Sequence, residues 1–263
     1  MVKNFRKRKI KILIWQKIND YQEVKAELIK PVIEKYFFSV SQIQAGFNQE
    51  IKEEVILIPK HEGIEYVVSS FIANEMYTFK DGKVILGDTG AKKMSKIHQL
   101  YSGTVKTEDG EYKKLIADKA EYIKNNYVGK KIAIYYIFIS EGDILKSYFK
   151  NWTDNPEKFN QSEDKVFICQ IQSGSMGVNL RTADFIIFYN IHFSSLLYWQ
   201  ARARMQDKNR TKESVVHWIF TEGGIEEKIY RTVLQKKDYT LQYYRRDYER
   251  TSTSNKSNKK VAN

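Results

Sequence analysis

One stretch of the sequence, residues 166–220, constrains the fold more than any other. It contains three short apolar runs, at residues 166–171, 185–189 and 215–220, each of the length of a buried strand. A loop rich in glycine and serine follows the first run, and a helical pattern at residues 195–206 precedes the third. Buried strands that alternate with loops and helices are typical of parallel sheets, so this stretch predicts an α/β fold.

Two motifs stand out in this stretch. The first consists of Ser173, Gly174, Gly177, Asn179, Leu180, Ala183 and Asp184, and the second of Gln200, Ala201 and Arg204. They resemble motifs V and VI of Swi/Snf-like superfamily-two helicases, and most closely those of the compact helicases of bacteriophages and prophages. The resemblance covers about residues 20–240 and is strongest after Lys130. It implies a RecA-like lobe, which is a parallel sheet flanked by helices, preceded here by a mixed α+β linker region.

The resemblance also implies roles for particular side chains. Arg204 would be a catalytic arginine finger that neutralises charge developing on the γ-phosphate of ATP. The family's second arginine falls on Asp207, so Arg210, or else Arg202, is the candidate to replace it. The expected nucleotide-binding residues are Gly177, Asn179, Gln200 and Arg202, and the expected DNA-binding residues are Ser173, Gly174, Ser175, Lys92, Lys93 and Lys96.

Each of these roles has a purely structural alternative. The arginines would then be surface charges on a basic helix, the lysines a solvated helix face, and the motif V loop an ordinary connection between strand and helix. The side chain of Asn179 is better suited to bonding the backbone of its own loop. Tyr198, Trp199 and Trp218 have the spacing of core residues rather than of a base-stacking platform.

The ATP-holding half of such an enzyme is not recognisable in this sequence. Residues 87–93, GDTGAKK, lack the G-x-x-x-x-G-K-[ST] spacing of a phosphate loop, and no DExH-like box is present. Thr89 is better interpreted as the N-cap of a helix over residues 91–100. ATP and magnesium are therefore expected only in a complete two-lobe enzyme, with none held by this chain alone. A separate chain carrying the first lobe is a candidate partner.

Charge points to a polyanionic partner. The 263 residues include 44 Lys and Arg against 32 Asp and Glu, a net charge of +12. Such a balance favours a polyanionic partner, and nucleic acid is the usual one; the alternative is a basic surface that binds nothing. Together with the motifs it predicts sequence-independent binding to the DNA backbone. Cys169, the only cysteine, lies in an apolar run and is expected to be a structural thiol, and His98 has no second ligand at metal-binding spacing. No apolar stretch approaches a membrane span, so no membrane partner and a cytoplasmic location, in a bacterial or phage-infected cell, are expected.

The chain divides by pattern into four segments. We expect a basic arm at residues 1–19, an inter-lobe linker or brace at 20–125, the RecA-like lobe at 126–240 and a basic, disordered tail at 241–263. Helices are expected at residues 113–127, 140–149 and 226–239, strands at 55–58 and 131–139, and a loop at 151–164.

The function expected from these observations is the second lobe of a Swi/Snf-like ATP-dependent DNA helicase or translocase. The lobe would bind the DNA backbone and supply residues of motifs V and VI to an ATP site whose phosphate-loop half is absent from this chain. By itself the chain is expected to be inactive as an NTP hydrolase. The alternative is a non-catalytic nucleic-acid-binding module that keeps the fold of the lobe.

Overall fold

The computed structural model describes residues 9–13, 16–20, 31–32, 51–174, 178–206, 210 and 212–248. The chain forms two compact units, Met1–Asn48 and Gln49–Asn263, which are described separately. In the first unit, β1 (Lys9–Leu13) pairs antiparallel with β2 (Gln16–Asp20), so the segment predicted as a basic arm contains a hairpin.

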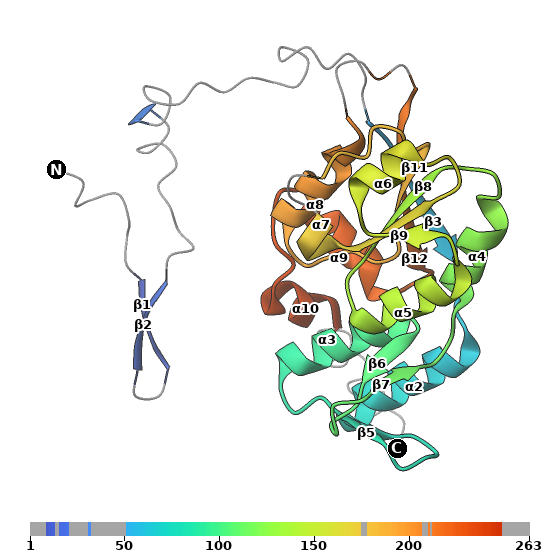
Figure 1. The fold of residues 1–263 in the computed structure, drawn as a ribbon. Coiled ribbons are helices and arrows are strands. Elements are labelled where there is room, and N and C mark those ends of the chain that lie inside the picture. Colours follow the sequence, from blue (N-terminus) through green and yellow to red (C-terminus); the bar gives the residue numbers. More distant parts are fainter. Residues whose placement is uncertain are drawn as a thin grey trace. The chain divides into compact units, whose positions relative to one another are not determined.

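The second unit is built on a six-stranded sheet. The strands lie in the order β3 (Ile51–Ile58), β12 (Ser214–Thr221), β11 (Phe185–Phe188), β8 (Ile132–Tyr136), β10 (Val166–Gln170) and β9 (Trp152–Thr153). All neighbouring pairs are parallel. The predicted fold class is confirmed: the unit is a RecA-like parallel sheet flanked by helices (Figure 1).

Helices cover both faces of this sheet because its central strands are apolar on both faces. In β8, Ile132 and Ile134 pack in one cluster with α4 (Asp118–Asn126) and α5 (Ile139–Tyr148). Ala133 and Tyr135 alternate with them and pack in the other cluster. The second cluster is covered by α6 (Pro156–Gln161), α7 (Ile171–Gly174), α8 (Ser195–Arg202), α9 (Ile225–Val233) and α10 (Leu241–Tyr248).

A row of stacked aromatic rings crosses the second face and fixes the position of α8. Phe188 is in register with both Tyr135 and Trp218 on the neighbouring strands. The Phe188 and Trp218 rings stack at 3.9 Å, and Tyr198 of α8 stacks on Trp218 at 5.0 Å. All four rings are fully buried. Tyr198 and Trp218 are therefore core residues, as their spacing predicted.

The part of the predicted linker that follows β3 belongs to the second unit. Its elements are α2 (Glu62–Asn74), β4 (Met76–Thr78), β5 (Val84–Leu86), α3 (Gly90–Tyr101), β6 (Thr104–Lys106) and β7 (Tyr112–Lys114). Thr89 is the N-cap of α3, since its side chain accepts a hydrogen bond from the backbone N–H of Lys92. The helix predicted over residues 113–127 is wrong in its first third. Residues up to Lys114 pair as β7 with β6, and α4 begins only at Asp118.

Three further differences concern segment boundaries. The sheet is not confined to residues 126–240, because β3 pairs with β12 along all eight of its residues. The predicted loop at 151–164 contains β9 and α6, where the Asn155 side chain caps the helix and Phe159 is fully buried. The predicted disordered tail begins with α10, which is held to the core by the buried side chain of Tyr244. Burial of single aromatic residues thus orders segments whose average composition is polar.

Candidate functional site: the junction of motifs V and VI

The two motifs identified in the sequence meet in the structure. Motif V runs from the end of β10 through α7 toward β11, and motif VI occupies α8 and a short 3-10 helix, Ala203–Met205. The backbone N–H of Leu180 donates a hydrogen bond to the carbonyl oxygen of Arg204 at 3.0 Å. This bond joins the end of the motif V loop directly to the predicted finger residue.

Arg204 differs from its two neighbouring arginines in what its guanidinium contacts. The side chain is partly exposed, and its Nε, like those of Arg202 and Arg210, is buried without a hydrogen-bond partner among the described residues. Its charge lies near Tyr135 of β8: burial raises the pKa of the Tyr135 phenol, and Arg204 opposes that shift. No ion pair of Arg204 is found in the part of the chain that the structure describes, whereas Arg202 pairs with Glu53.

Arg202, by contrast, is held by contacts within the protein. Its guanidinium forms an ion pair with Glu53 of β3 and lies over the Trp199 ring at 4.8 Å. The same carboxylate accepts hydrogen bonds from the Tyr198 hydroxyl at 2.7 Å and from the Trp218 indole N–H at 3.0 Å. Glu53 therefore ties motif VI to the edge strand of the sheet. A nucleotide-binding role for Arg202 would require this ion pair to open.

Arg210 is also committed, and its neighbourhood does not favour the role of substitute finger. Its guanidinium donates to the backbone carbonyls of Arg181 at 2.5 Å, Ala183 at 2.8 Å and Glu213 at 2.7 Å. These carbonyls lie just before β11 and β12, so the side chain fastens the starts of two adjacent strands. Desolvation lowers the pKa of the Arg210 guanidinium, as expected for a partly buried structural arginine.

The motif V loop is held by asparagine side chains. The Asn179 carboxamide oxygen accepts the backbone N–H of Arg181 at 2.9 Å, the loop-bonding role that its sequence position suggested. Asn160 of α6 donates to the Asn179 carbonyl oxygen at 2.8 Å and accepts from the Thr182 hydroxyl at 2.8 Å. Ser173 is exposed and Gly174 ends α7, whereas Ser175 and Gly177 lie outside the described residues.

The three lysines expected to face DNA lie on α3, away from motifs V and VI in the sequence, and each has an acidic neighbour. Lys92 pairs with Asp88 at 2.9 Å, Lys93 with Glu75 at 2.6 Å and Lys96 with Glu108 at 3.2 Å. The Lys93 and Lys96 side chains are only 15% and 12% exposed, so only Lys92, at 47%, is readily accessible to a phosphate. The solvated-face alternative therefore fits Lys92, whereas Lys93 and Lys96 are largely covered and paired within the protein.

Gln200 and Trp199 occupy the middle of α8 and are partly buried. Trp199 packs against the core cluster, and the indole N–H has no partner among the described residues. The residue that sequence reasoning missed is Glu53. The sequence does contain a signal for this role. Glu53 and its neighbour Glu54 lie in an apolar strand, so one of the two carboxylates must face the core, and a buried carboxylate needs hydrogen-bond donors.

A buried polar network joins α3 to the carboxyl ends of β8 and β11. His98 Nε2 lies 2.6 Å from the Asn190 side-chain oxygen, and the Asn190 amide donates to Glu141 at 2.7 Å. The other Glu141 oxygen accepts the backbone N–H groups of Ile137 and Phe138. Burial lowers the pKa of His98 to about 3 and raises the pKa of Glu141. Burial therefore keeps His98 neutral against the opposing effect of the Asn190 hydrogen bond, and the network ties α3 to the ends of β8 and β11.

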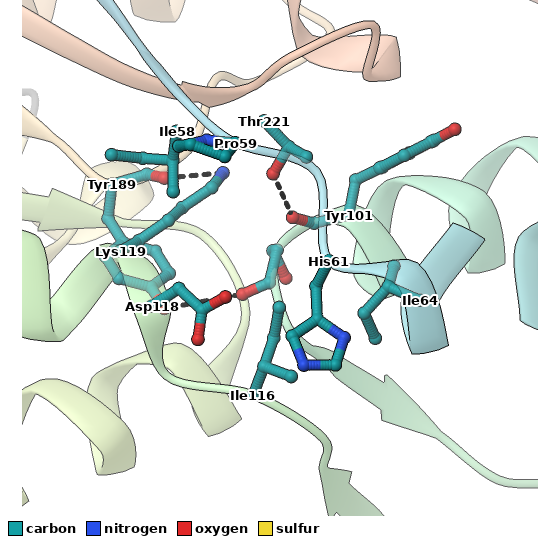
Figure 2. Close-up of a pocket in the computed structure, with 11 residues that line it drawn as sticks. Ile58, Pro59, His61, Ile64, Tyr101, Ile116, Asp118, Lys119, Tyr189 and Thr221 are labelled. Carbon is teal, nitrogen blue, oxygen red and sulfur yellow. Dashed lines mark hydrogen bonds between the residues drawn. The ribbon is translucent and has the colours of Figure 1, made fainter. Parts of the chain in front are cut away.

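A second buried pair closes the same end of the sheet. Lys119 of α4 and Glu226 of α9 form an ion pair at 2.7 Å, with side chains 4% and 0% exposed. Figure 2 shows Lys119 and Tyr189 at one side of a small cavity, with Tyr101 and Thr221 at another. The cavity measures about 10 Å³, which leaves room for no more than one water. This end of the sheet is therefore filled by the linker region rather than open to a ligand.

Other kinds of site are not apparent in the described residues. No group of three or more His, Cys, Asp or Glu side chains there could hold a metal ion. Cys169 is a free, half-buried thiol whose pKa is raised by burial. Within the described part of the chain, no helix combines the length and the apolar character needed to cross a membrane.

Part of this chain is similar to chromatin-remodelling ATPases. It is 27% identical over 127 residues to the chromatin-remodelling ATPase INO80 of Pyricularia oryzae, covering 42% of this chain and 6% of the relative. It is 26% identical over 149 residues to INO80 of Neurospora crassa, covering 50% of this chain and 7% of the relative. The chain thus matches only a small fraction of the length of these relatives. No protein-family model matches the chain.

Among solved structures, the C-terminal part of the Fun30 ATPase domain is 24% identical, with a TM-score of 0.41 over 48% of this chain and 47% of that one. The similarity to chromatin-remodelling ATPases agrees with the Swi/Snf-like character of motifs V and VI. The expected bacteriophage type is not supported, since the relatives reported above are fungal. The expected cytoplasmic location in a bacterial or phage-infected cell is contradicted by the same finding, because the relatives are chromatin-remodelling ATPases of fungi.

Proposed function

We propose that this chain contains the second lobe of a Swi/Snf-like ATP-dependent DNA translocase. In this proposal the lobe binds the DNA backbone and presents Arg204 to an ATP site whose phosphate-loop half lies on another lobe. The observation that carries the proposal is the hydrogen bond between Leu180 and Arg204, which joins motifs V and VI. Since Arg202 and Arg210 are engaged by Glu53 and by backbone carbonyls, Arg204 is the motif VI arginine available to a γ-phosphate.

The chemistry required of Arg204 is electrostatic. ATP bound with magnesium on the first lobe supplies the transferable phosphoryl group, and a guanidinium neutralises the charge that develops on its oxygens. The planar fork of arginine suits phosphate oxygens better than the ammonium of lysine does. Gln200, four residues earlier on α8, is the second candidate to face the nucleotide or the first lobe.

The test is to supply a matching first lobe, by fusion or by mixing chains, and to measure DNA-stimulated phosphate release. Arg204→Ala should lower turnover by roughly 10³-fold or more, the range for arginine fingers, and leave DNA affinity nearly unchanged. Arg231→Ala is the matched control, because this arginine is 76% exposed on α9 and should have no effect on turnover. Arg210→Ala should lower stability before it lowers turnover, because it leaves three backbone carbonyls without their donor.

DNA binding is measured separately on the chain alone. Affinity should be independent of sequence, with a slope of log K against log salt of roughly −0.9 for each phosphate neutralised. The chain alone should release no phosphate from ATP. If Arg204→Ala lowers DNA affinity and spares turnover, the helix contacts DNA and the finger role is wrong.

Asp207, at the position of the family's second arginine, favours one competing function, a non-catalytic DNA-binding module. That function predicts salt-dependent DNA binding but no turnover with any first lobe. The two proposals therefore differ in one measurement, the turnover of the reconstituted enzyme.

A further inference from the structure

A second, larger pocket lies on the opposite face of the sheet from motif VI. It has a volume of about 410 Å³ and lies between β3, β11, β12 and α4. The residues that give it chemical character are Glu54, Tyr122, Tyr127, Lys130, Phe185 and His217. It is an open depression at the surface, more exposed to solvent than the small cavity in Figure 2.

The sheet register explains why these side chains gather. His217 of β12 is directly opposite Glu54 of β3, and Phe185 starts the neighbouring strand β11. Residues two apart in a strand share a face, so Phe185, His217 and Glu54 all project toward the α4 side of the sheet. Tyr122 on α4 and Tyr127 just after it complete the lining.

The rings form a connected aromatic surface. The Tyr127 ring lies 5.4 Å from Phe185 and 5.7 Å from His217, and Phe185 lies 4.9 Å from His217. The Tyr127 hydroxyl contacts His217 Nδ1, which fixes the imidazole ring. Tyr127 is 7% exposed and the His217 side chain 12%, so a planar ring can meet these rings at their exposed edges, with the partly exposed Tyr122 beside them.

One carboxylate at this surface, that of Glu54, remains largely exposed although it contacts His217. The Glu54 side chain is 68% exposed, and its ion-pair partner among the described residues is His217, at 3.5 Å. Burial lowers the pKa of His217, so the imidazole is mostly neutral at pH 7 and neutralises Glu54 poorly. The neighbouring Lys52, in contrast, already pairs with Glu213. Glu54 can therefore accept two hydrogen bonds from a ligand held against the rings.

We propose that this pocket binds a guanine base, held against the aromatic rings, with its two adjacent N–H donors on the Glu54 carboxylate and its phosphate near Lys130. Guanine presents two donors side by side on its Watson–Crick edge, which match the two oxygens of a carboxylate. Adenine and cytosine each place a ring-nitrogen acceptor beside their amine, and a carboxylate repels that acceptor. The base could belong to a free guanine nucleotide or to an unpaired guanine in a nucleic-acid strand.

An arginine side chain of a partner protein also fits a carboxylate and stacks on aromatic rings, but the observations favour the nucleotide. Lys130 lines the pocket, is exposed, and forms no ion pair within the described residues. Its charge attracts a phosphate and repels a guanidinium, and the net charge of +12 acts in the same direction. The proposed site does not involve motif V or VI, so it stands independently of the function proposed above.

The test measures binding of GMP, IMP, AMP and guanosine to the full chain by calorimetry. GMP should bind more tightly than IMP, which lacks the 2-amino donor, and than AMP. Glu54→Gln should weaken GMP binding by about 10- to 100-fold, the range for hydrogen bonds to a charged group. Tyr122→Ala should weaken it by about tenfold through lost stacking, and Lys130→Ala should abolish the preference for GMP over guanosine.

Glu121→Gln is the matched control, because this exposed glutamate precedes Tyr122 on α4 and does not line the pocket. A second arm compares oligonucleotides with one unpaired guanine against fully paired ones. Preference for the unpaired guanine, lost in Glu54→Gln, assigns the site to a nucleic-acid strand, whereas GMP binding without that preference assigns it to a free nucleotide. Equal binding of GMP and AMP, insensitivity to Glu54→Gln, or binding only of an arginine amide probe would each overturn the proposal.

Discussion

Removal of the Glu53 carboxylate is the most direct test of how motif VI is held on the sheet. The two carboxylate oxygens serve the Arg202 guanidinium, the Tyr198 hydroxyl and the Trp218 indole N–H. Glu53→Ala leaves all three donors without their acceptor. Because Tyr198 and Trp218 are fully buried, water cannot replace the lost bonds without opening the core.

The size of the effect follows from these two donors. A buried donor left unsatisfied costs about 1–3 kcal/mol, so two of them cost about 2–6 kcal/mol. The Arg202 ion pair, with side chains 18% and 12% exposed, adds to this cost. For a unit of this size, about 4 kcal/mol corresponds to a fall in Tm of roughly 8–16 °C. Glu53→Gln keeps one acceptor and should cost less than Glu53→Ala.

The assay is urea and thermal unfolding followed by circular dichroism at 222 nm. Glu54→Ala is the control, since this neighbouring glutamate points to the other face and is 68% exposed, and its effect should stay within about 0.5 kcal/mol. In the reconstituted ATPase, Glu53→Gln should lower turnover more than DNA affinity, because it disturbs the helix that leads to Arg204. Equal unfolding midpoints for Glu53→Ala and Glu54→Ala would refute the reasoning.

Three further outcomes are expected. Lys119→Met should lower the free energy of unfolding by about 3–5 kcal/mol, because it leaves the buried carboxylate of Glu226 without its partner. Replacing both residues by apolar ones should restore much of this loss. Additive effects in the double-mutant cycle would contradict the prediction. Burial lowers the pKa of His98 in the folded chain to about 3, so between about pH 3 and 6.5 the unfolded chain binds a proton that the folded chain does not. The free energy of unfolding should therefore fall as the pH falls through this window. In acid-unfolding titrations, His98→Gln should remove up to about 1.4 kcal/mol per pH unit of this dependence. Gly103→Ala should lower the free energy of unfolding by more than about 1 kcal/mol, because Gly103 has a φ of +88° and an added Cβ would lie 2.6 Å from the Ile116 carbonyl oxygen. An unchanged Tm would show that the turn can relax.

The sequence by itself determined features whose causes are local. The apolar runs at β10, β11 and β12 predicted buried strands because their length and uniform hydrophobicity suffice to identify them. Thr89 marked the start of α3 because a cap acts within three residues of itself. The parallel sheet followed from the alternation of these elements, and the motif spacing singled out Arg204.

Only the tertiary structure decided which charges are free to act. Arg202 and Arg204 are two residues apart, yet one is held by a carboxylate from β3 and the other is not. Glu53 lies 145 residues from Tyr198 in the chain and 2.7 Å from its hydroxyl. Arg210 likewise contacts carbonyls on two strands that meet only in the folded sheet. Helix and strand propensity and motif spacing depend on neighbours in the sequence. The role of a charge depends instead on the atoms within about 3 Å of it. Here the long-range pairing of β3 with β12 brings those atoms together.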